Sequence, residues 1–244
     1  MLKFGLLGKK LDYSFSKTFF TDLFAKNEID ASYENIEVAN LSEWFEAKYF
    51  TDFSGFNVTI PYKSEIIPFL DELSDEAKVI GAVNTVKNVN GKLIGYNTDA
   101  FGFGQSIKPF LNNNHERAMI LGTGGASKAI AYVLKKIGLD VIFISRNPKS
   151  SNEFGYDSIN ENMVNACKMI VNCTPIGTFP EVEAKPNFPT ELIGDKHLVV
   201  DLIYNPEKSL LLKESEKQGA IILNGYSMLQ EQAKKAWEIW NYFI

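Results

Sequence analysis

Histidine and cysteine are scarce in this chain of 244 residues, and each scarcity excludes a class of function. The two histidines, His115 and His197, lie far from any serine or cysteine motif, so a Ser-His-Asp or Cys-His mechanism has no support. The two cysteines, Cys167 and Cys173, form no Cys-x-x-Cys pair, which indicates reduced thiols and no zinc site. Any proton transfer therefore falls to a lysine or a carboxylate.

Long apolar runs and long basic runs are also missing. No segment reaches the length that a membrane-spanning helix requires, and the start of the chain has too few apolar residues for a signal peptide. Acidic residues (30) outnumber basic ones (25), and no basic cluster is long enough to bind a nucleic acid. We therefore expect a cytoplasmic protein with a small-molecule substrate and no nucleic-acid, membrane or metal partner, and a monomer rather than a homodimer.

Residues 118–149 carry the pattern of a dinucleotide-binding unit. An apolar strand expected over 118–121 leads into a glycine turn and then into a helix that ends at Gly138. Glycines at such a turn let the backbone approach a pyrophosphate, whose charge is met by free N–H groups and the positive end of the helix dipole. The turn and the start of the helix consist of Gly122, Thr123, Gly124, Gly125, Ala126 and Ser127.

The end of the next strand, expected over 141–145, distinguishes between the two nicotinamide cofactors. An acidic residue at this point usually holds the ribose 2′-hydroxyl of NAD, and the chain has none here. The residues present are Ser145, Arg146, Asn147 and Lys149. A guanidinium beside an ammonium suits a 2′-phosphate, so we expect NADP(H) and redox chemistry. The alternative is that the glycine turn only connects a strand tightly to a helix.

Strands and helices alternate along the rest of the chain, which predicts an α/β fold of two domains. We expect strands over 3–7, 33–38, 55–60, 82–87 and 92–96 and helices over 16–26 and 101–110. Asn90 and Gly91 favour a tight hairpin between the last two strands. Apolar residues from Met228 to Trp240 recur at helical spacing, and this helix should cover the first domain.

The expected order of elements divides the chain discontinuously. Residues 1–99 plus 223–244 form a substrate-binding domain, and residues 100–222 form a Rossmann NADP-binding domain. We expect the two to close over a substrate about the crossovers near Ala100 and Leu223.

Two polar segments near the start of the chain have the composition of a ligand site. Ser14 and Ser16 are separated by one residue, so in an extended segment both hydroxyls could donate to one carboxylate. Ser16 could equally be the N-cap of the helix that follows. Thr59 and Lys63 follow a strand at the point where open α/β sheets place ligands, with a helix expected after Pro61. The alternative for Lys63 is a solvated surface charge.

Two more polar segments follow. Asn84 places an amide in a strand that is otherwise apolar, and a buried amide needs hydrogen-bond partners. Asp99 ends the segment Asn97-Thr98-Asp99 and precedes a helix, for which it could serve as the N-cap. Each segment is ambiguous on its own.

Together these segments resemble the shikimate dehydrogenase family over the whole chain. Eight motifs carry the resemblance in order: Ser-Phe-Ser at 14–16, Asn-Val-Thr-Ile-Pro-Tyr-Lys at 57–63, Gly-Ala-Val-Asn-Thr at 81–85, Asn-Thr-Asp at 97–99, Gly-Thr-Gly-Gly-Ala-Ser at 122–127, Asn-Cys-Thr-Pro-Ile-Gly at 172–177, Asp-Leu-Ile-Tyr-Asn-Pro at 201–206 and Gly-Tyr-Ser-Met-Leu-Gln-Glu-Gln at 225–232. The resemblance implies the NADP-dependent interconversion of 3-dehydroshikimate and shikimate in aromatic amino acid biosynthesis.

The resemblance also implies roles for individual residues. Lys63 would be the catalytic lysine, with Asp99 as its partner. The substrate-binding residues would be Ser14 and Ser16 for the carboxylate, and Thr59, Asn84, Tyr204 and Gln232 for the carboxylate or the ring hydroxyls. The cofactor-binding residues would be Gly122, Thr123, Gly124, Gly125, Ala126, Ser145, Arg146, Asn147, Lys149, Thr174, Ile203 and Gly225.

The chemistry of a ketone reduction agrees with these roles. An ammonium that hydrogen-bonds the reacting oxygen can supply the proton and stabilise the developing charge. A free lysine is protonated at neutral pH, so Lys63 suits the reducing direction as an acid, and alcohol oxidation should strengthen toward alkaline pH.

Three alternatives stay open. They are a quinate or shikimate dehydrogenase with NAD preference, a catalytically silent ligand-binding paralogue, and another two-domain dehydrogenase such as a methylene-tetrahydrofolate enzyme. Lys63 with Asp99 argues against the second, and the pair Ser14 and Ser16 argues against the third. Tyr13 and Lys17 stand where family members commonly carry a histidine and a proline, and Lys17 would add a charge near the carboxylate.

Overall fold

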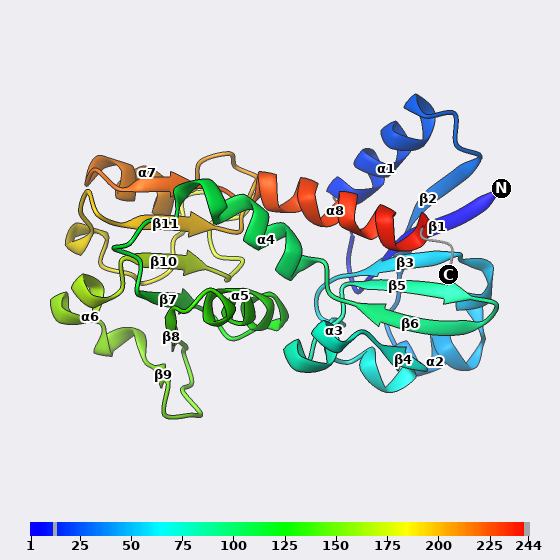
Figure 1. Cartoon of the computed structure of the whole chain (residues 1–244), viewed down its shortest axis with the longest axis horizontal. Helices are drawn as coiled ribbons and strands as arrows, with labels where there is room; N and C mark the ends of the chain where they lie inside the picture. Colours follow the sequence, from blue (N-terminus) through cyan, green and yellow to red (C-terminus); the bar gives the residue numbers. More distant parts are fainter. Residues whose placement is uncertain (12–13, 242–244) are drawn as a thin grey trace. The chain divides into compact units, whose positions relative to one another are not determined.

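The computed structural model describes residues 1–11 and 14–241, and the chain falls into two compact units (Figure 1). Unit 1 comprises Met1–Gly102 and the chain from Glu231 onward, and unit 2 comprises Phe103–Gln230. Helix α4 (Asp99–Ile107) begins in unit 1 and ends in unit 2, whereas helix α8 (Tyr226–Asn241) begins in unit 2 and ends in unit 1. The α/β class expected from the sequence is confirmed. Among the described residues, no helix has the length and apolar character to cross a membrane.

Unit 1 contains a mixed six-stranded sheet in the order β2-β1-β3-β5-β6-β4. Its strands are β1 (Leu2–Gly8), β2 (Ala31–Glu37), β3 (Gly55–Val58), β4 (Glu72–Leu73), β5 (Thr85–Val89) and β6 (Lys92–Tyr96). Strands β1, β2 and β3 are parallel, and β5 pairs antiparallel with both β3 and β6. Asn90 (φ 55°) and Gly91 (φ 89°) form the expected tight hairpin between β5 and β6.

The two faces of this sheet bury different side chains because neighbouring residues of a strand point to opposite faces. On one face Leu7 and Ile36 pack with α2 (Leu41–Glu46) and α3 (Asp75–Ile80). On the other face Phe4 and Tyr33 pack with α1 (Phe15–Lys26) and α8. The sequence expectation that the C-terminal helix covers the first domain is thus confirmed. Trp240 of α8 also donates from Nε1 to the carbonyl oxygen of Val86, at 2.9 Å.

Unit 2 contains a parallel six-stranded sheet in the order β12-β11-β10-β7-β8-β9. Its elements are β7 (Arg117–Leu121), α5 (Gly125–Lys136), β8 (Asp140–Ile144), β9 (Glu153–Phe154), α6 (Glu161–Ala166), β10 (Met169–Asn172), β11 (Leu198–Asp201), α7 (Leu210–Lys217) and β12 (Ile221–Leu223). The central strands are continuous apolar runs, as expected for a parallel sheet covered on both faces.

Three sequence expectations about local structure are wrong. The chain after Pro61 forms turns up to a short 3-10 helix at Ile67–Phe69, because tertiary hydrogen bonds hold it: the Tyr62 hydroxyl donates to the Val38 carbonyl oxygen. The strand expected from residue 82 begins only at β5. Helix α4 begins earlier than expected and ends at Ile107, where a 3-10 turn with Pro109 follows, because proline lacks the N–H that the helix would need.

A buried carboxylate ties together the C-terminal ends of strands β10 and β11. The Asp201 side chain accepts hydrogen bonds from Asn172 Nδ2 at 3.0 Å, from Ser209 Oγ at 2.5 Å and from the Ile203 backbone N–H at 3.1 Å. Burial raises the pKa of Asp201 to about 6, and the three hydrogen bonds offset only part of that effect. The interior of unit 2 therefore favours a protonated Asp201 in mildly acidic solution.

We expect the wild-type protein to gain stability, relative to Asp201→Asn, as the pH falls from about 7 to about 5. Between the folded pKa of about 6 and the unfolded value of 3.8, the native state holds a proton that the unfolded chain has lost. The resulting gain in the free energy of unfolding is fully present below the unfolded pKa of 3.8 and is lost as the pH rises through about 6. The total gain is about 3 kcal/mol. Urea unfolding at several pH values measures it. Asp140→Asn, an exposed control, should keep the wild-type pH dependence, and the same dependence in Asp201→Asn would contradict the prediction.

A glycine at the start of α8 allows two segments of unit 2 to approach closely. The Gly225 N–H donates to the Ile203 carbonyl oxygen at 3.0 Å, and a Cβ atom at Gly225 would lie 2.1 Å from the Leu202 carbonyl oxygen. Because the obstacle is backbone, a side chain here requires the chain itself to move.

Gly225→Ala should therefore destabilise the protein by about 1–3 kcal/mol, the usual cost of overpacking. Gly194→Ala is the matched control, because a Cβ at Gly194 meets no atom within 4 Å. Thermal unfolding of the two variants provides the measurement, and equal melting temperatures would show that the segments at Leu202 and Gly225 can separate without cost.

Candidate functional site

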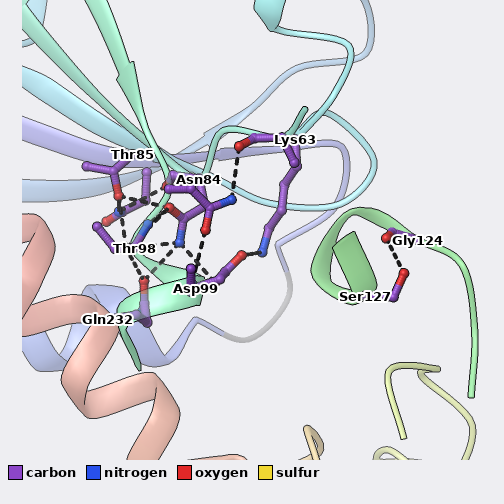
Figure 2. Close-up of polar contacts among 12 residues, drawn as sticks. Lys63, Asn84, Thr85, Thr98, Asp99, Gly124, Ser127 and Gln232 are labelled. Atoms are coloured by element: carbon purple, nitrogen blue, oxygen red, sulfur yellow. Dashed lines mark hydrogen bonds and ion pairs between the residues drawn. The ribbon is translucent and has the colours of Figure 1, made fainter. Parts of the chain in front are cut away.

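An ion pair between Lys63 and Asp99 is the centre of the polar site in unit 1. Lys63 lies in the turn after β3, and Asp99 is the first residue of α4. The Lys63 Nζ atom lies 2.6 Å from Asp99 Oδ2, and the two side chains are only 14% and 7% exposed (Figure 2). Lys63 is thus no solvated surface charge. The Lys63 carbonyl oxygen also accepts from the Val83 N–H at 2.6 Å, which ties the turn to the segment before β5.

The second oxygen of Asp99 accepts from the amide of Asn84. Asn84 Nδ2 lies 2.9 Å from Asp99 Oδ1, and Asn84 Oδ1 accepts from the Thr98 backbone N–H at 2.6 Å. A backbone N–H can only donate, so it fixes the Asn84 oxygen on its own side and turns the NH2 group toward Asp99. Asp99 therefore accepts on both oxygens, which is what an ionised carboxylate does.

Two threonines and a glutamine complete the hydrogen bonds around Asn84. The Thr98 hydroxyl lies 3.2 Å from that of Thr85 and 3.3 Å from Gln232 Oε1, and Asn84 Nδ2 lies 3.4 Å from the same Gln232 oxygen (Figure 2). Gln232 comes from α8 and lies 148 residues after Asn84 in the sequence. The structure thus brings Lys63, Asn84, Asp99 and Gln232 together, as the resemblance implied for the site.

The N-cap alternative for Asp99 is wrong. Asp99 lies inside the first turn of α4, and the side chain of Asn97 accepts from the Ala100 N–H at 3.1 Å. Asn97 therefore satisfies the helix start, which leaves both oxygens of Asp99 for Lys63 and Asn84.

The two serines of the Ser-Phe-Ser motif have different environments. Ser14 is the N-cap of α1 and accepts from the Lys17 N–H at 3.1 Å, so the N-cap alternative for Ser16 is wrong. Ser16 lies in the first turn of α1 and is buried. Thr59 is half-buried beside β1, with its N–H bonded to the Leu7 carbonyl oxygen at 2.9 Å. Tyr13 lies outside the described residues, and Lys17 is exposed.

The glycine turn of unit 2 has the features of a pyrophosphate site. Gly122 has φ +101°, which favours glycine, and Gly124 is the N-cap of α5. A Cβ at Gly124 would meet no protein atom within 4 Å, so the turn is open to an approaching ligand. The Ser127 hydroxyl, in place of the third glycine, donates to the Gly124 carbonyl oxygen at 2.6 Å, and the first turn of α5 carries no acidic residue. These features fit a bound anion.

The residues after β8 fit a phosphorylated ribose. Arg146 and Lys149 are exposed at the carboxyl end of this strand, and the Asn147 N–H bonds to Ser145 Oγ at 3.2 Å. The nearest acidic side chain in sequence, Glu153, accepts from the Lys149 N–H at 2.9 Å. Both cationic side chains thus remain on the surface at the strand end where the sequence places the 2′-phosphate.

The other residues expected near the cofactor lie at the ends of strands β10 and β11 and before α8. The Thr174 hydroxyl donates to Asn172 Oδ1 at 2.7 Å, and Tyr204 is half-buried after β11. Ile203 and Gly225 are joined by the backbone bond described above. All of these residues belong to unit 2, so Tyr204 does not belong to the unit that holds Lys63 and Asp99.

The sequence motifs gave no role to several buried polar residues of unit 1. Among them are Tyr33, Asn57, Thr85 and Thr98. The amide of Asn57 in an otherwise apolar strand was the available signal, because such an amide needs partners. Within the described part of the chain, no three His, Cys, Asp or Glu side chains form a possible metal site.

Comparisons with known proteins identify the family of this chain. The model of the shikimate dehydrogenase substrate binding domain matches residues 6–86. An NADP(+) shikimate dehydrogenase of Desulforamulus reducens is 35% identical, over 98% of this chain and 89% of that protein.

Solved structures give the same result for the fold. Shikimate dehydrogenase from Aquifex aeolicus has a TM-score of 0.88 at 36% identity, covering 98% of this chain and 92% of that one. The enzyme from Thermus thermophilus, solved with NADP(H) and shikimate, has a TM-score of 0.86 at 30% identity, covering 100% and 95%. With such identity over almost its entire length, the chain belongs to the shikimate dehydrogenase family.

Proposed function

We propose that this protein catalyses the reversible, NADPH-dependent reduction of 3-dehydroshikimate to shikimate. The observation that carries the proposal is the buried pair of Lys63 and Asp99, hydrogen-bonded to Asn84. A lysine that is held by a carboxylate can deliver a proton at one defined point, which a ketone reduction needs.

The residues of unit 2 fit NADP(H) as the cofactor. The turn at Gly122 and Gly124 and the N-terminus of α5 would hold the pyrophosphate, and Arg146 with Lys149 would hold the 2′-phosphate. When bound, the nicotinamide supplies hydride to the ketone or accepts it from the alcohol. The cofactor would also contact Ser145 and Asn147 after β8, Thr174 and Ile203 after β10 and β11, and Gly225 before α8.

Lys63 is the residue that exchanges a proton with the substrate oxygen. In the reducing direction its ammonium group hydrogen-bonds the ketone oxygen, stabilises the negative charge that develops there and transfers the proton to it. Asp99 holds the lysine in place from Oδ2, and Asn84 holds Asp99 from the other side. In the oxidising direction neutral Lys63 takes the proton of the substrate hydroxyl.

The substrate would be held by hydroxyl and amide groups, of which all but Tyr204 belong to the same unit as this pair. Ser14 and Ser16 would donate to the ring carboxylate, and Thr59, Tyr204 and Gln232 would contact the carboxylate or the ring hydroxyls. Asn84 is 3% exposed and its amide is bonded within the protein. Its main contribution is to orient Asp99, and a substrate bond would replace one of these contacts.

One assay distinguishes the proposed function from an NAD-preferring quinate or shikimate dehydrogenase and from a silent paralogue. Nicotinamide absorbance is followed with shikimate or quinate against NADP+ or NAD+, and shikimate with NADP+ should give the highest kcat/KM. Higher kcat/KM with NAD+ or quinate would favour the first alternative, and tight cofactor binding without turnover would favour the silent paralogue. The domain limits, the hinge, the monomeric state and the cytoplasmic location stay predictions.

Lys63→Met should lower kcat for shikimate oxidation by about 10²–10⁴, the usual contribution of a general acid or base, with a smaller change in KM. The methionine keeps the length of the side chain and removes its proton. Lys92→Met is the matched control: Lys92 forms an ion pair of the same 2.6 Å length with Glu72 but is half exposed at the start of β6. Steady-state kinetics of both variants test the role, and near-normal turnover in Lys63→Met would refute it.

Arg146→Gln should lower the preference for NADP+ over NAD+ by about tenfold or more, because a charge-assisted hydrogen bond contributes about 1.5–3 kcal/mol. The kcat/KM for NAD+ should change little, since NAD+ has no 2′-phosphate. Arg117, the only other arginine of the chain, lies at the opposite end of the same sheet, and Arg117→Gln serves as the control. Equal losses with both cofactors would argue against a 2′-phosphate site at Arg146.

A further inference from the structure

Two polar side chains lie next to each other at the ends of neighbouring strands in unit 2. Asn172 is the last residue of β10 and Asp201 the last residue of β11, and the two are partners in the parallel register, so their side chains share one face of the sheet. On its other side Asn172 is the partner of Leu121, the residue before the glycine turn (Figure 1). Asn172 and Asp201 are both fully buried. None of the roles described so far requires Asp201 to be a carboxylate.

The directions of the hydrogen bonds around Asn172 are fixed. The Thr174 N–H lies 3.0 Å from Asn172 Oδ1, and an N–H can only donate, so the amide oxygen faces Thr174. The amide NH2 group therefore faces Asp201 and donates to its Oδ1 at 3.0 Å. Asp201 Oδ1 also accepts from the Ile203 N–H at 3.1 Å. One carboxylate oxygen thus holds Thr174 through Asn172 and holds the Ile203 backbone directly.

The hydroxyl of Thr174 is oriented by the same contacts. It lies 2.7 Å from Asn172 Oδ1, which can only accept, so the hydroxyl proton points to Asn172. Thr174 Oγ1 can then only accept, as it does from the Ile176 N–H at 3.4 Å. Thr174 also lies against the glycine turn, because a Cβ atom at Gly122 would be 3.1 Å from Thr174 Cγ2. An acceptor of fixed direction therefore lies beside the turn proposed to hold the pyrophosphate.

The order of the strands indicates which half of the cofactor would meet these residues. Strands β11, β10, β7 and β8 are adjacent in this order and parallel, so their carboxyl ends lie along one edge of the sheet. In the proposed function the 2′-phosphate lies after β8 and the pyrophosphate after β7. A dinucleotide that continues in the same direction would bring its nicotinamide half to the ends of β10 and β11, where Thr174 and Ile203 follow.

We propose that Asp201 is a positioning residue for the nicotinamide half of the cofactor, acting through Asn172 on Thr174 and directly on the backbone of Ile203. The proposal rests on the proposed function, in which Thr174 and Ile203 contact NADP(H). Asp201 itself touches no cofactor atom in this role. It sets the direction of the groups that do, so its loss should weaken binding of one half of the cofactor and not of the other.

The second oxygen of Asp201 provides an internal comparison. Asp201 Oδ2 accepts from the Ser209 hydroxyl at 2.5 Å, and Ser209 is the N-cap of α7. This bond joins the carboxylate to a helix and leads to neither Thr174 nor Ile203. A contact that only stabilises the fold and a contact that orients cofactor-binding groups are thus made by different oxygens of one side chain.

Asp201→Ala tests the proposal through the binding of two ligands. The Kd for NADP+ should rise about tenfold, the effect of losing one well-placed hydrogen bond. The Kd for adenosine 2′,5′-bisphosphate, which has the 2′-phosphate but no nicotinamide, should change less than about twofold. Calorimetric titration measures both constants. Equal losses of affinity for the two ligands would overturn the proposal, because they would indicate a general loss of structure.

Two further variants separate positioning from stability. In Asp201→Asn the amide oxygen can replace Oδ1, since Asn172 and Ile203 both donate, and the new NH2 group can donate to Ser209 Oγ. Its Kd for NADP+ should stay within about twofold of the wild-type value. Ser209→Ala removes a helix cap, so it should lower the melting temperature and keep the Kd for NADP+. A tenfold rise of this Kd in either variant would contradict the proposed role of Oδ1.

Thr174→Val tests the same inference even if Asp201→Ala does not fold. Thr174 is half-buried, and valine keeps the shape of its side chain while removing the hydroxyl that Asn172 holds. The Kd for NADP+ should rise about two- to tenfold, with the Kd for adenosine 2′,5′-bisphosphate unchanged. Wild-type affinity for NADP+ in Thr174→Val would overturn the proposed action through Asn172.

These binding measurements also separate the inference from the proposed function, because they need no turnover. A wild-type protein that binds NADP+ without oxidising shikimate would overturn the function, and the affinities alone would still decide the role of Asp201. A wild-type protein that oxidises shikimate, together with an unchanged Kd for NADP+ in Asp201→Ala, would overturn the role of Asp201 alone. A wild-type protein that does not bind NADP+ would overturn both.

Discussion

The bond between the Lys63 ammonium and the Asp99 carboxylate is the constraint on which the organisation of unit 1 depends. Removing two charges from water is costly, and their attraction compensates only where further hydrogen bonds satisfy the remaining oxygens. Asn84 provides such a bond, and the Thr98 backbone fixes the orientation of Asn84. The turn after β3, the start of β5, the start of α4 and helix α8 therefore have to meet at one place.

The charged and anion-binding groups of unit 2 are arranged differently from those of unit 1. Its glycine turn offers backbone N–H groups and a helix N-terminus where an anion can bind, and its cationic side chains at the end of β8 stay on the surface. Burial raises the pKa of its deeply buried carboxylate, Asp201, and three neutral hydrogen-bond donors offset only part of that rise. Unit 1 thus pairs its buried carboxylate Asp99 with a lysine, whereas unit 2 holds its buried carboxylate with neutral donors and exposes its cationic side chains at the end of β8.

Periodicity and motifs predicted much of this from the sequence, and tertiary contacts explain what they missed. The glycine turn, helix α5 and helix α8 follow from local pattern, and the motifs identified Lys63 and Asp99 in advance. The turn after Pro61 could not be predicted, because a hydrogen bond from Tyr62 to a distant strand end maintains it. Tyr33 and Asn57 were missed because their hydrogen bond joins two strands, β2 and β3, that come together only in the folded sheet, on either side of β1.

Helix α8 has a consequence for the order of events during synthesis. Its residues Ala233, Ala236 and Trp240 complete the core around Phe4 and Phe20, although all of unit 2 lies between them in the sequence. A nascent chain on the ribosome therefore carries an uncovered aromatic surface until helix α8 emerges. The strands of unit 2 lie in one continuous stretch of the chain, so unit 2 can fold before α8 covers unit 1. Chaperones that bind exposed aromatic segments therefore have their main target in the residues that precede unit 2.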